Sequence, residues 1–217
     1  MMPFLNERNI IPPHQFGFRE QHGTIEQVNR LTAEIRKRFE LKKYCSAFFI
    51  DVAQAFDKVW HEGLIHKIKR CLPPITHKVL ESYLTNRQFR VKCNDYVTHE
   101  YEIEAGVPQG SVLGPILYLI YTSDLPECDS LTISTFADDT AVLSSQNDPS
   151  LASRELNKYL RLLEKWLKKW RIKVNEIKSK HVTFSLRRGD CPTVTLNNVC
   201  IPCLLYTSPS PRDGLLS

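Results

Sequence analysis

Two adjacent carboxylates, Asp138 and Asp139, stand between two short runs of apolar and β-branched residues, 131–136 and 140–143. This pattern predicts a β-hairpin that carries the acidic pair at its tip. A plain turn is one interpretation, because aspartate side chains bond readily to their own backbone. A divalent-metal platform is the other, since two like charges near a third carboxylate repel one another unless a cation such as Mg²⁺ binds them.

Asp51 is the candidate for that third carboxylate. It stands in the run 44–52, YCSAFFIDV, whose nearly continuous apolar character predicts a strand buried on both faces. A lone aspartate after a strand ordinarily caps a helix. Here residues 53–72 continue with helical periodicity until Pro73-Pro74. A strand, a sharp bend and a helix would therefore place Asp51 at an exposed tip.

A third chemical signal lies in residues 106–111, GVPQGS, which have glycines on both sides of a proline and a glutamine. Glycines before a helix let backbone approach a ligand closely, and the free N–H groups of a helix start favour anions. Ser111 can cap the apolar helix expected over 112–121, with Pro115 in its first turn. Taken alone this is also a common turn before a helix.

The remaining chain supplies elements that would hold these residues. Residues 25–41 repeat apolar positions at helical spacing, and Thr24 with Gln27 forms a capping box. The other expected elements are a helix over 75–84, a hairpin over 89–103, a strand over 181–186 and a small hairpin over 193–201 that turns at Asn197-Asn198.

Positive charge is concentrated in residues 151–173. Eight basic residues there are balanced by only two acidic ones, so the surplus of six exceeds the +5 of the whole chain. A basic helix is usually a solvated face, but this concentration also suits contact with a polyanion. Apolar residues line the other face of the helix expected over 151–172, and we assign Trp166 and Trp170 to the core rather than to base stacking.

Length and composition bound the class of protein. The 217 residues, 42% of them hydrophobic, suit one substantial globular domain or a piece of a larger one. No apolar run reaches the roughly 18 residues that a membrane span needs. Residues 1–13 lack the apolar core of a secretory signal, so we expect an intracellular protein, without a choice between nucleus and cytoplasm.

Seven scattered cysteines, an odd number, predict reduced thiols rather than a disulfide framework. Cys200 and Cys203 form a single CxxC, with Cys191 and His181 nearby, so a zinc site is an alternative use of these side chains. The irregular spacing makes it a weak one.

Three blocks in order carry a resemblance: FFIDVAQAFD (48–57), GVPQGSVLGPIL (106–117) and FADD (136–139). Together they resemble the sequence blocks of reverse transcriptases. Their residues are most similar to those of non-LTR retrotransposons, notably the jockey-like elements of insects. The flanking sequences HQFGFREQHGT, DKVWHEGL and LEKWLKKWRIKVNEIKS are similar as well. The resemblance therefore covers about residues 9–202.

The resemblance implies a polymerase site on these residues. Asp51, Asp138 and Asp139 match carboxylates that hold two Mg²⁺ ions, with Mn²⁺ as an alternative, and Val52 is assigned to the same metal site. One ion lowers the pKa of the primer 3′-hydroxyl, and the other stabilises the triphosphate and the leaving pyrophosphate. Lys178 is similar to a lysine that assists pyrophosphate departure.

Substrate contacts follow from the same resemblance. Phe56 matches an aromatic that closes against a ribose 2′-hydroxyl and so prefers deoxynucleotides, and Gln109 with Gly110 matches residues along the incoming nucleotide. We expect Lys165, Lys168 and Lys169 of the basic helix to contact nucleic acid. The implied partners are an RNA template, a DNA primer and deoxynucleoside triphosphates, with no membrane and no identified protein partner.

The architecture that the resemblance implies is α+β: a polymerase palm, which is an antiparallel sheet with helices packed on one face, plus partial fingers. We expect residues 1–202 to be a reverse transcriptase domain incomplete at both ends (fingers remnant and palm). Residues 203–217 do not resemble the sequence of the family, so we expect them to be a disordered or artefactual tail. The expected function is RNA-directed DNA polymerase, and the alternative is a catalytically inactive fragment that binds nucleic acid. An RNA-dependent RNA polymerase is a third interpretation, which Phe56 disfavours.

Overall fold

The computed structural model describes residues 1–189 and 191–206, which divide into two compact units that we describe separately. Unit 1 comprises Met1–Pro13, Gln54–Asp124 and Lys169–Ile172, and unit 2 comprises His14–Ala53, Leu125–Lys168 and the described residues from Lys173 onward. No helix in these described ranges has the length and apolar character needed to cross a bilayer.

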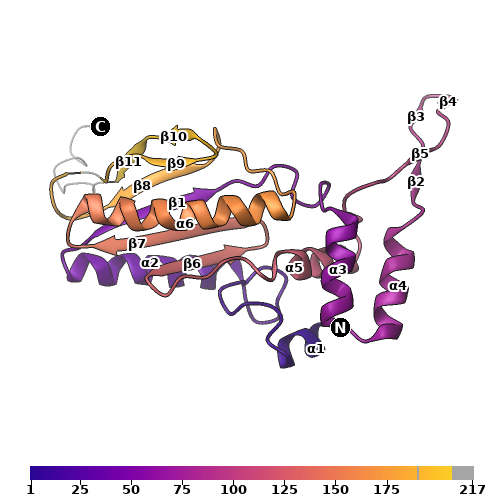
Figure 1. Ribbon diagram of the computed structural model, residues 1–217, viewed down its shortest axis with the longest axis horizontal. Helices are drawn as coiled ribbons and strands as arrows, with labels where there is room; N and C mark the ends of the chain where they lie inside the picture. Colours follow the sequence, from indigo (N-terminus) through magenta and orange to yellow (C-terminus); the bar gives the residue numbers. More distant parts are fainter. Residues whose placement is uncertain (190, 207–217) are drawn as a thin grey trace. The chain divides into compact units, whose positions relative to one another are not determined.

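Unit 2 is built on a five-stranded sheet in the order β11-β8-β1-β7-β6 (Figure 1). Its strands are β1 (Tyr44–Ile50), β6 (Leu131–Phe136), β7 (Asp139–Gln146), β8 (Lys180–Phe184) and β11 (Cys203–Tyr206). All neighbours are antiparallel except β11 and β8, which are parallel. The predicted buried strand is β1, which lies at the centre of the sheet and is buried along nearly its whole length.

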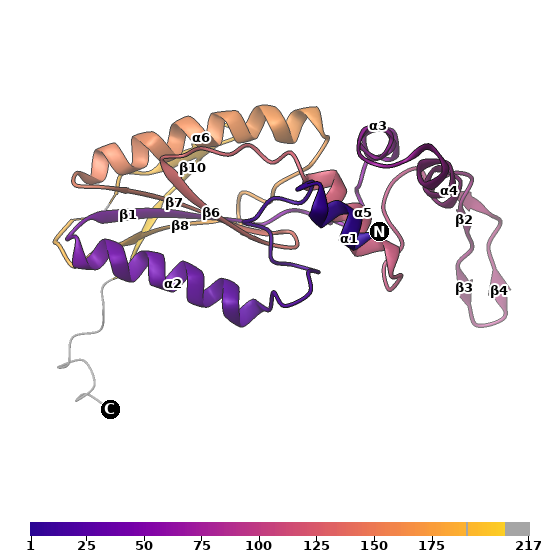
Figure 2. The ribbon, with the colours of Figure 1, turned by 90° about the horizontal axis from the view of Figure 1, so that it is seen from below.

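Two long helices cover this sheet, α2 (Thr24–Glu40) and α6 (Pro149–Lys169), one on each face (Figure 2). Ile35 of α2 packs with Cys45, whereas Ala152 of α6 packs with Tyr44. Successive strand residues point to opposite faces, so these two contacts lie on opposite sides of β1. The α+β content is as predicted, but the expectation of helices on one face is wrong, because a central strand that is apolar on both sides needs cover on both.

The capping box predicted at the start of α2 does not form. The N-cap is Gly23, without a side-chain cap, and the Gln27 side chain is buried elsewhere. Its amide nitrogen donates to the carbonyl oxygens of His14, at 3.0 Å, and Thr135, at 2.9 Å. Two buried carbonyl acceptors satisfy this amide better than the solvated helix end would.

Unit 1 contains four helices and a two-part hairpin among its described residues. They are α1 (Met2–Glu7), α3 (His61–Cys71), α4 (Pro74–Leu84), α5 (Leu113–Thr122), β2 (Gln88–Phe89) paired with β5 (Tyr101–Glu102), and β3 (Lys92–Cys93) paired with β4 (Tyr96–Val97). The helix predicted from residue 53 begins only at His61. Residues 53–58 form turns instead. The Phe56 carbonyl accepts the Val107 N–H, and the Val59 carbonyl accepts the Gly106 N–H, so neither bonds to the next helical turn.

The chain after β8 forms the predicted hairpin from β9 (Val194–Leu196) and β10 (Val199–Ile201). Asn197 and Asn198 both have positive φ, 51° and 62°, as a two-residue hairpin turn requires. Cys203–Tyr206, the first residues of the predicted tail, form β11, which pairs parallel to β8. Residues 207–217, the rest of the predicted tail, lie outside the described residues.

Candidate active site

The register between β1 and β7 brings two of the predicted carboxylates together. Its last pair is Ile50 with Thr140, so the next residues along the antiparallel strands are Asp51 and Asp139. Asp51 is half-buried and Asp139 is exposed. Both side chains therefore stand at the same end of the central pair of strands in unit 2, as the sequence predicted for a strand end beside a hairpin tip.

Asp138 lies in the turn between β6 and β7. Phe136 pairs with Asp139, which leaves Ala137 and Asp138 as the two turn residues. Ala137 has φ 58°, a left-handed conformation that costs a residue with a Cβ more than it costs glycine. The Asp-Asp pair is therefore part of a tight two-residue hairpin, and its second member begins β7.

The three carboxylates affect one another electrostatically. Partial burial, followed by the negative charges of Asp138 and Asp51, raises the pKa of the Asp139 carboxyl. Among the described residues, no three His, Cys, Asp or Glu side chains converge closely enough to form a metal site by themselves. The raised pKa of Asp139 and the absence of such a cluster are compatible. Coulomb repulsion between carboxylates acts over several ångströms, whereas the ligands of one ion must lie much closer to one another. Three mutually repelling oxygen donors are the donor set that suits a hard divalent cation.

Two residues that the sequence did not single out, Asn175 and Ser179, hold the backbone of Asp51. The Asp51 N–H donates to the hydroxyl oxygen of Ser179 at 3.1 Å, and the Asp51 carbonyl accepts the Asn175 N–H at 2.8 Å. Val52 forms a bridge with Val174. Ser179 is 2% exposed, so its contact with Asp51 is shielded from water. A serine and an asparagine in a polar connector give no local signal of this role.

Lys178 lies inside this same segment. Its side chain is exposed, and its backbone N–H donates to the Asn175 side-chain oxygen at 3.2 Å. Asn175 and Ser179 on either side of it both bond to Asp51, so the structure brings the chain around Lys178 to the end of β1. The prediction for the Lys178 ammonium itself remains a prediction.

Unit 1 brings the predicted nucleotide-binding residues together. The Phe56 carbonyl accepts the Val107 N–H at 2.8 Å, and the Gln109 amide donates to a carboxylate oxygen of Asp57 at 2.7 Å. The Phe56 ring stacks on Tyr118 of α5, with centroids 4.6 Å apart and planes at 28°. The segment after Asp51 and the Pro-Gln-Gly turn are therefore one local structure.

Two glycines in this turn serve different purposes. Gly106 has φ 91°, and a Cβ there would lie 2.7 Å from the Asp57 carbonyl oxygen, so only glycine fits. Gly110 has φ 77°, but a Cβ there would meet open space. Gly110 is therefore required by its backbone conformation alone. The N-cap of α5 is Val112 rather than the predicted Ser111, but the Ser111 hydroxyl oxygen still accepts the N–H of Gly114 in the first turn at 2.9 Å.

The basic helix has the predicted division of faces. Trp166 and Trp170 are 8% and 5% exposed, which agrees with their assignment to the core. Lys165, Lys168 and Lys169 are exposed, and the Lys169 ammonium lies 4.8 Å from the centroid of the Trp170 ring. The contact of these lysines with nucleic acid remains a prediction.

The alternative zinc site has no support in the geometry. All seven cysteines are free thiols, and Cys200 is exposed while Cys191 is buried. The Cys203 sulfur lies 2.8 Å from the Thr183 hydroxyl, and the His181 ring bonds to the Ser46 hydroxyl at 2.7 Å. These side chains have protein partners of their own and do not converge in the described part of the chain.

Comparison with known sequences gives consistent results. Residues 1–205 match the family model described as reverse transcriptase (RNA-dependent DNA polymerase). The chain is 46% identical over 191 residues to the probable RNA-directed DNA polymerase from transposon BS of Drosophila melanogaster, covering 84% of this chain and 21% of that protein. It is 44% identical over 195 residues to the RNA-directed DNA polymerase from mobile element jockey of the same organism, covering 86% and 21%. The chain thus spans about a fifth of the length of these curated relatives.

Solved structures share the fold at low identity. The telomerase of Candida tropicalis, solved with a TWJ fragment of telomeric RNA, matches with a TM-score of 0.65 and 15% identity, over 93% of this chain and 35% of that one. The corresponding telomerase of Candida albicans matches with a TM-score of 0.59 and 14% identity, over 83% and 33%. At this identity the likeness concerns the fold, and it agrees with the predicted polymerase palm.

Proposed function

The chain belongs to the reverse transcriptase family, and on this basis we propose that it is part of an RNA-directed DNA polymerase encoded by a non-LTR retrotransposon. In the proposed reaction the primer 3′-oxygen bonds to the α-phosphorus of a deoxynucleoside triphosphate, and pyrophosphate leaves. The proposed template is RNA and the proposed primer is DNA.

A single observation carries this proposal. The β1–β7 register sets Asp51 beside Asp139, and the two-residue turn puts Asp138 next to it. An ordinary acidic turn has no need of a third carboxylate at the end of a neighbouring strand. The electrostatic effect of Asp51 and Asp138 on the pKa of Asp139 supports a shared site for cations.

We propose Asp51, Asp138 and Asp139, with Val52 beside them, as the residues that hold Mg²⁺. When bound, the ions would activate the primer hydroxyl and neutralise charge on the triphosphate and pyrophosphate. Ser179 and Asn175 keep the Asp51 backbone in place. Lys178, on the segment between them, would offer positive charge or a proton to the leaving pyrophosphate.

Unit 1 supplies the proposed nucleotide contacts. The Phe56 ring, supported by its stacking on Tyr118, would exclude a ribose 2′-hydroxyl by its bulk. Gln109, whose amide donates to the Asp57 carboxylate, and Gly110 would lie along the incoming nucleotide. Lys165, Lys168 and Lys169 would contact the phosphates of template or primer, a role that adds affinity without base specificity.

Primer extension tests this proposal directly. The chain, alone and within a full-length element protein, is supplied with an RNA template, an annealed DNA primer, deoxynucleotides and Mg²⁺. We expect Mg²⁺-dependent extension by the full-length protein and its loss in the Asp51→Asn/Asp138→Asn double variant. Lys37→Ala, an exposed substitution on α2, serves as the control and should extend normally.

Extension that survives in the double variant would show that these carboxylates do not hold the catalytic metals. The alternative predicted from the sequence, an inactive fragment that binds nucleic acid, gives a different result. It predicts that the chain alone retains binding of a primed template but extends no primer.

A further inference from the structure

We propose that Gln15 is a positioning residue that holds the turn bearing Asp138 in its left-handed conformation. Its side chain bonds to both polar groups of one turn residue. The Gln15 amide nitrogen donates to the Ala137 carbonyl at 3.1 Å, and the Gln15 amide oxygen accepts the Ala137 N–H at 2.9 Å. Gln15 is 122 residues away from Ala137 in the chain, so only the tertiary structure unites them.

The turn has a specific need for such support. Ala137 has φ 58°, a left-handed conformation that costs alanine more free energy than it costs glycine. A side-chain amide that satisfies both the N–H and the carbonyl of this residue offsets that cost, because each bond forms only in this orientation of the peptide units. The result is a fixed direction for the next residue, Asp138.

The approach of the Gln15 segment to the turn is close. A Cβ on Gly17 would lie 2.1 Å from the Ala137 nitrogen, so glycine is required at position 17. The Gly17 N–H donates to the same Gln15 amide oxygen at 2.8 Å, which orients the amide. The Phe16 N–H also donates to the Thr135 carbonyl at 2.9 Å, which extends β6 by a short parallel bridge.

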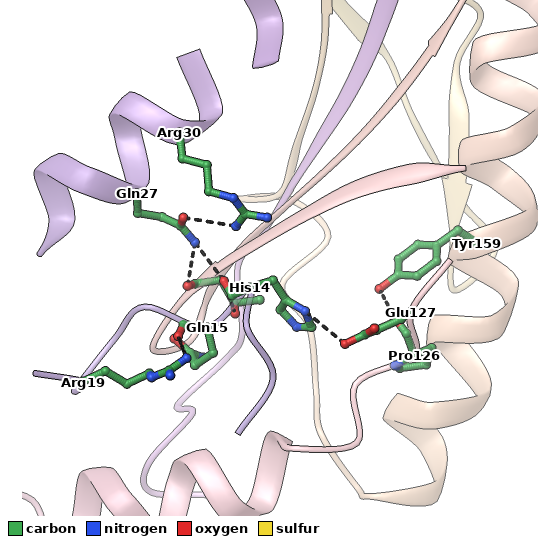
Figure 3. A network of polar contacts seen from close by, with 9 residues as sticks. His14, Gln15, Arg19, Gln27, Arg30, Pro126, Glu127 and Tyr159 are labelled. Atoms are coloured by element: carbon green, nitrogen blue, oxygen red, sulfur yellow. Dashed lines mark hydrogen bonds and ion pairs between the residues drawn. The ribbon is translucent and has the colours of Figure 1, made fainter. Parts of the chain in front are cut away.

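A second buried glutamine secures the arrangement from α2 (Figure 3). Gln15 and Gln27 are 5% and 6% exposed. The Gln27 amide bonds to the carbonyls of His14 and Thr135, so it joins α2, the Gln15 segment and β6. The His14 ring faces Glu127 at 3.2 Å on the other side. Satisfied buried networks of this kind are rigid, because breaking one bond leaves a buried group unpaired.

Amide exchange tests the structural claim without reference to activity. In Gln15→Ala, and in Gln15→Met, which keeps the side-chain volume, both bonds to Ala137 are lost. We therefore expect hydrogen exchange of residues 136–140 to accelerate by about tenfold. Exchange in residues 44–50 of β1 should remain unchanged. Gln21→Ala, an exposed glutamine in the same loop, is the matched control and should leave both segments unchanged.

A kinetic test rests on the proposed polymerase function. Misdirecting Asp138 should lower kcat for primer extension about tenfold while KM for the deoxynucleotide stays within about twofold, since geometry at the reacting centre is affected rather than nucleotide contacts. Adding Ala137→Gly should restore much of kcat, because glycine adopts the left-handed conformation without help. A residue needed only for general stability would not be rescued in this way.

Unchanged exchange at residues 136–140 would overturn the proposal, and so would equal acceleration in β1, which signals a general loss of stability. A drop in kcat that Ala137→Gly fails to rescue would overturn the positioning role. If the full-length protein extends no primer at all, the proposed function fails, and the exchange measurement still decides the role of Gln15.

Discussion

The Ser179 hydroxyl oxygen accepts the backbone N–H of Asp51 at 3.1 Å, across 128 residues of sequence. Ser179 is itself held, because its own hydroxyl donates to the Asn175 carbonyl at 2.8 Å and its N–H bonds to the same oxygen. The end of β1 is thus fixed by a side chain that precedes β8, and the position of one candidate metal ligand depends on a serine.

We therefore expect Ser179→Ala to destabilise the protein by about 1–3 kcal/mol, since it leaves the Asp51 N–H without its acceptor. Primer extension by the full-length protein should fall as well. Chemical denaturation and extension rates measure the two effects. Ser123→Ala, which removes a comparable hydroxyl bond to the Ile120 carbonyl in unit 1, should leave extension unchanged. Equal loss of extension in both variants would contradict a specific role for Ser179.

Phe56→Ala should relax sugar selectivity. Removing the ring opens space for a 2′-hydroxyl, and a steric contact of this size is worth about 10- to 200-fold in discrimination. Competition between ribonucleotides and deoxynucleotides in primer extension measures the ratio. Phe56→Tyr keeps the ring and should keep the selectivity. Unchanged selectivity in Phe56→Ala would remove Phe56 from the account of substrate choice.

Lys165→Ala/Lys168→Ala should weaken binding to primed RNA and make it less sensitive to salt. Each phosphate contact releases a counterion, so the slope of log affinity against log salt should decrease by about one for each lysine lost. Titrations at several salt concentrations give this slope. Lys37→Ala removes one exposed charge from α2 on the other face of the sheet and should leave the slope unchanged. An unaltered slope in the double variant would place the nucleic acid elsewhere.

Stability should decrease in acid because of His181. Burial lowers the pKa of this fully buried histidine from 6.5 to about 4. Between these values the unfolded chain takes up a proton that the folded chain does not, so the free energy of unfolding is highest above about pH 6.5 and falls toward pH 4 by about 3 kcal/mol. His181→Gln keeps a polar partner for Ser46 without titrating. Denaturation between pH 7 and pH 4 should show a shallower decline in this variant, and an identical decline would exclude His181 as the cause.

The pattern of neighbouring residues was sufficient to predict the strand, the hairpin and the helix faces of the site. A continuous apolar run indicated the central strand β1, and two β-rich runs around Asp138 and Asp139 indicated the hairpin, because alternation, length and turn residues are properties of neighbouring residues. The order of the three sequence blocks then indicated the family. The division of the basic helix into an apolar and a charged face was correct for the same reason.

Hydrogen bonds between residues far apart in the sequence determined the features that the sequence did not predict. Gln27 has the spacing of a capping box, yet its amide bonds to Thr135, 108 residues away. The helix expected from residue 53 is delayed to His61 because the backbone before it bonds to the turn at Gly106. Likewise Gln15 reaches Ala137 and Ser179 reaches Asp51 across more than a hundred residues. The sequence alone indicated which side chains are the candidates for the chemistry. Only the tertiary structure decided what holds them, because a buried polar group binds whichever partner folding brings within reach.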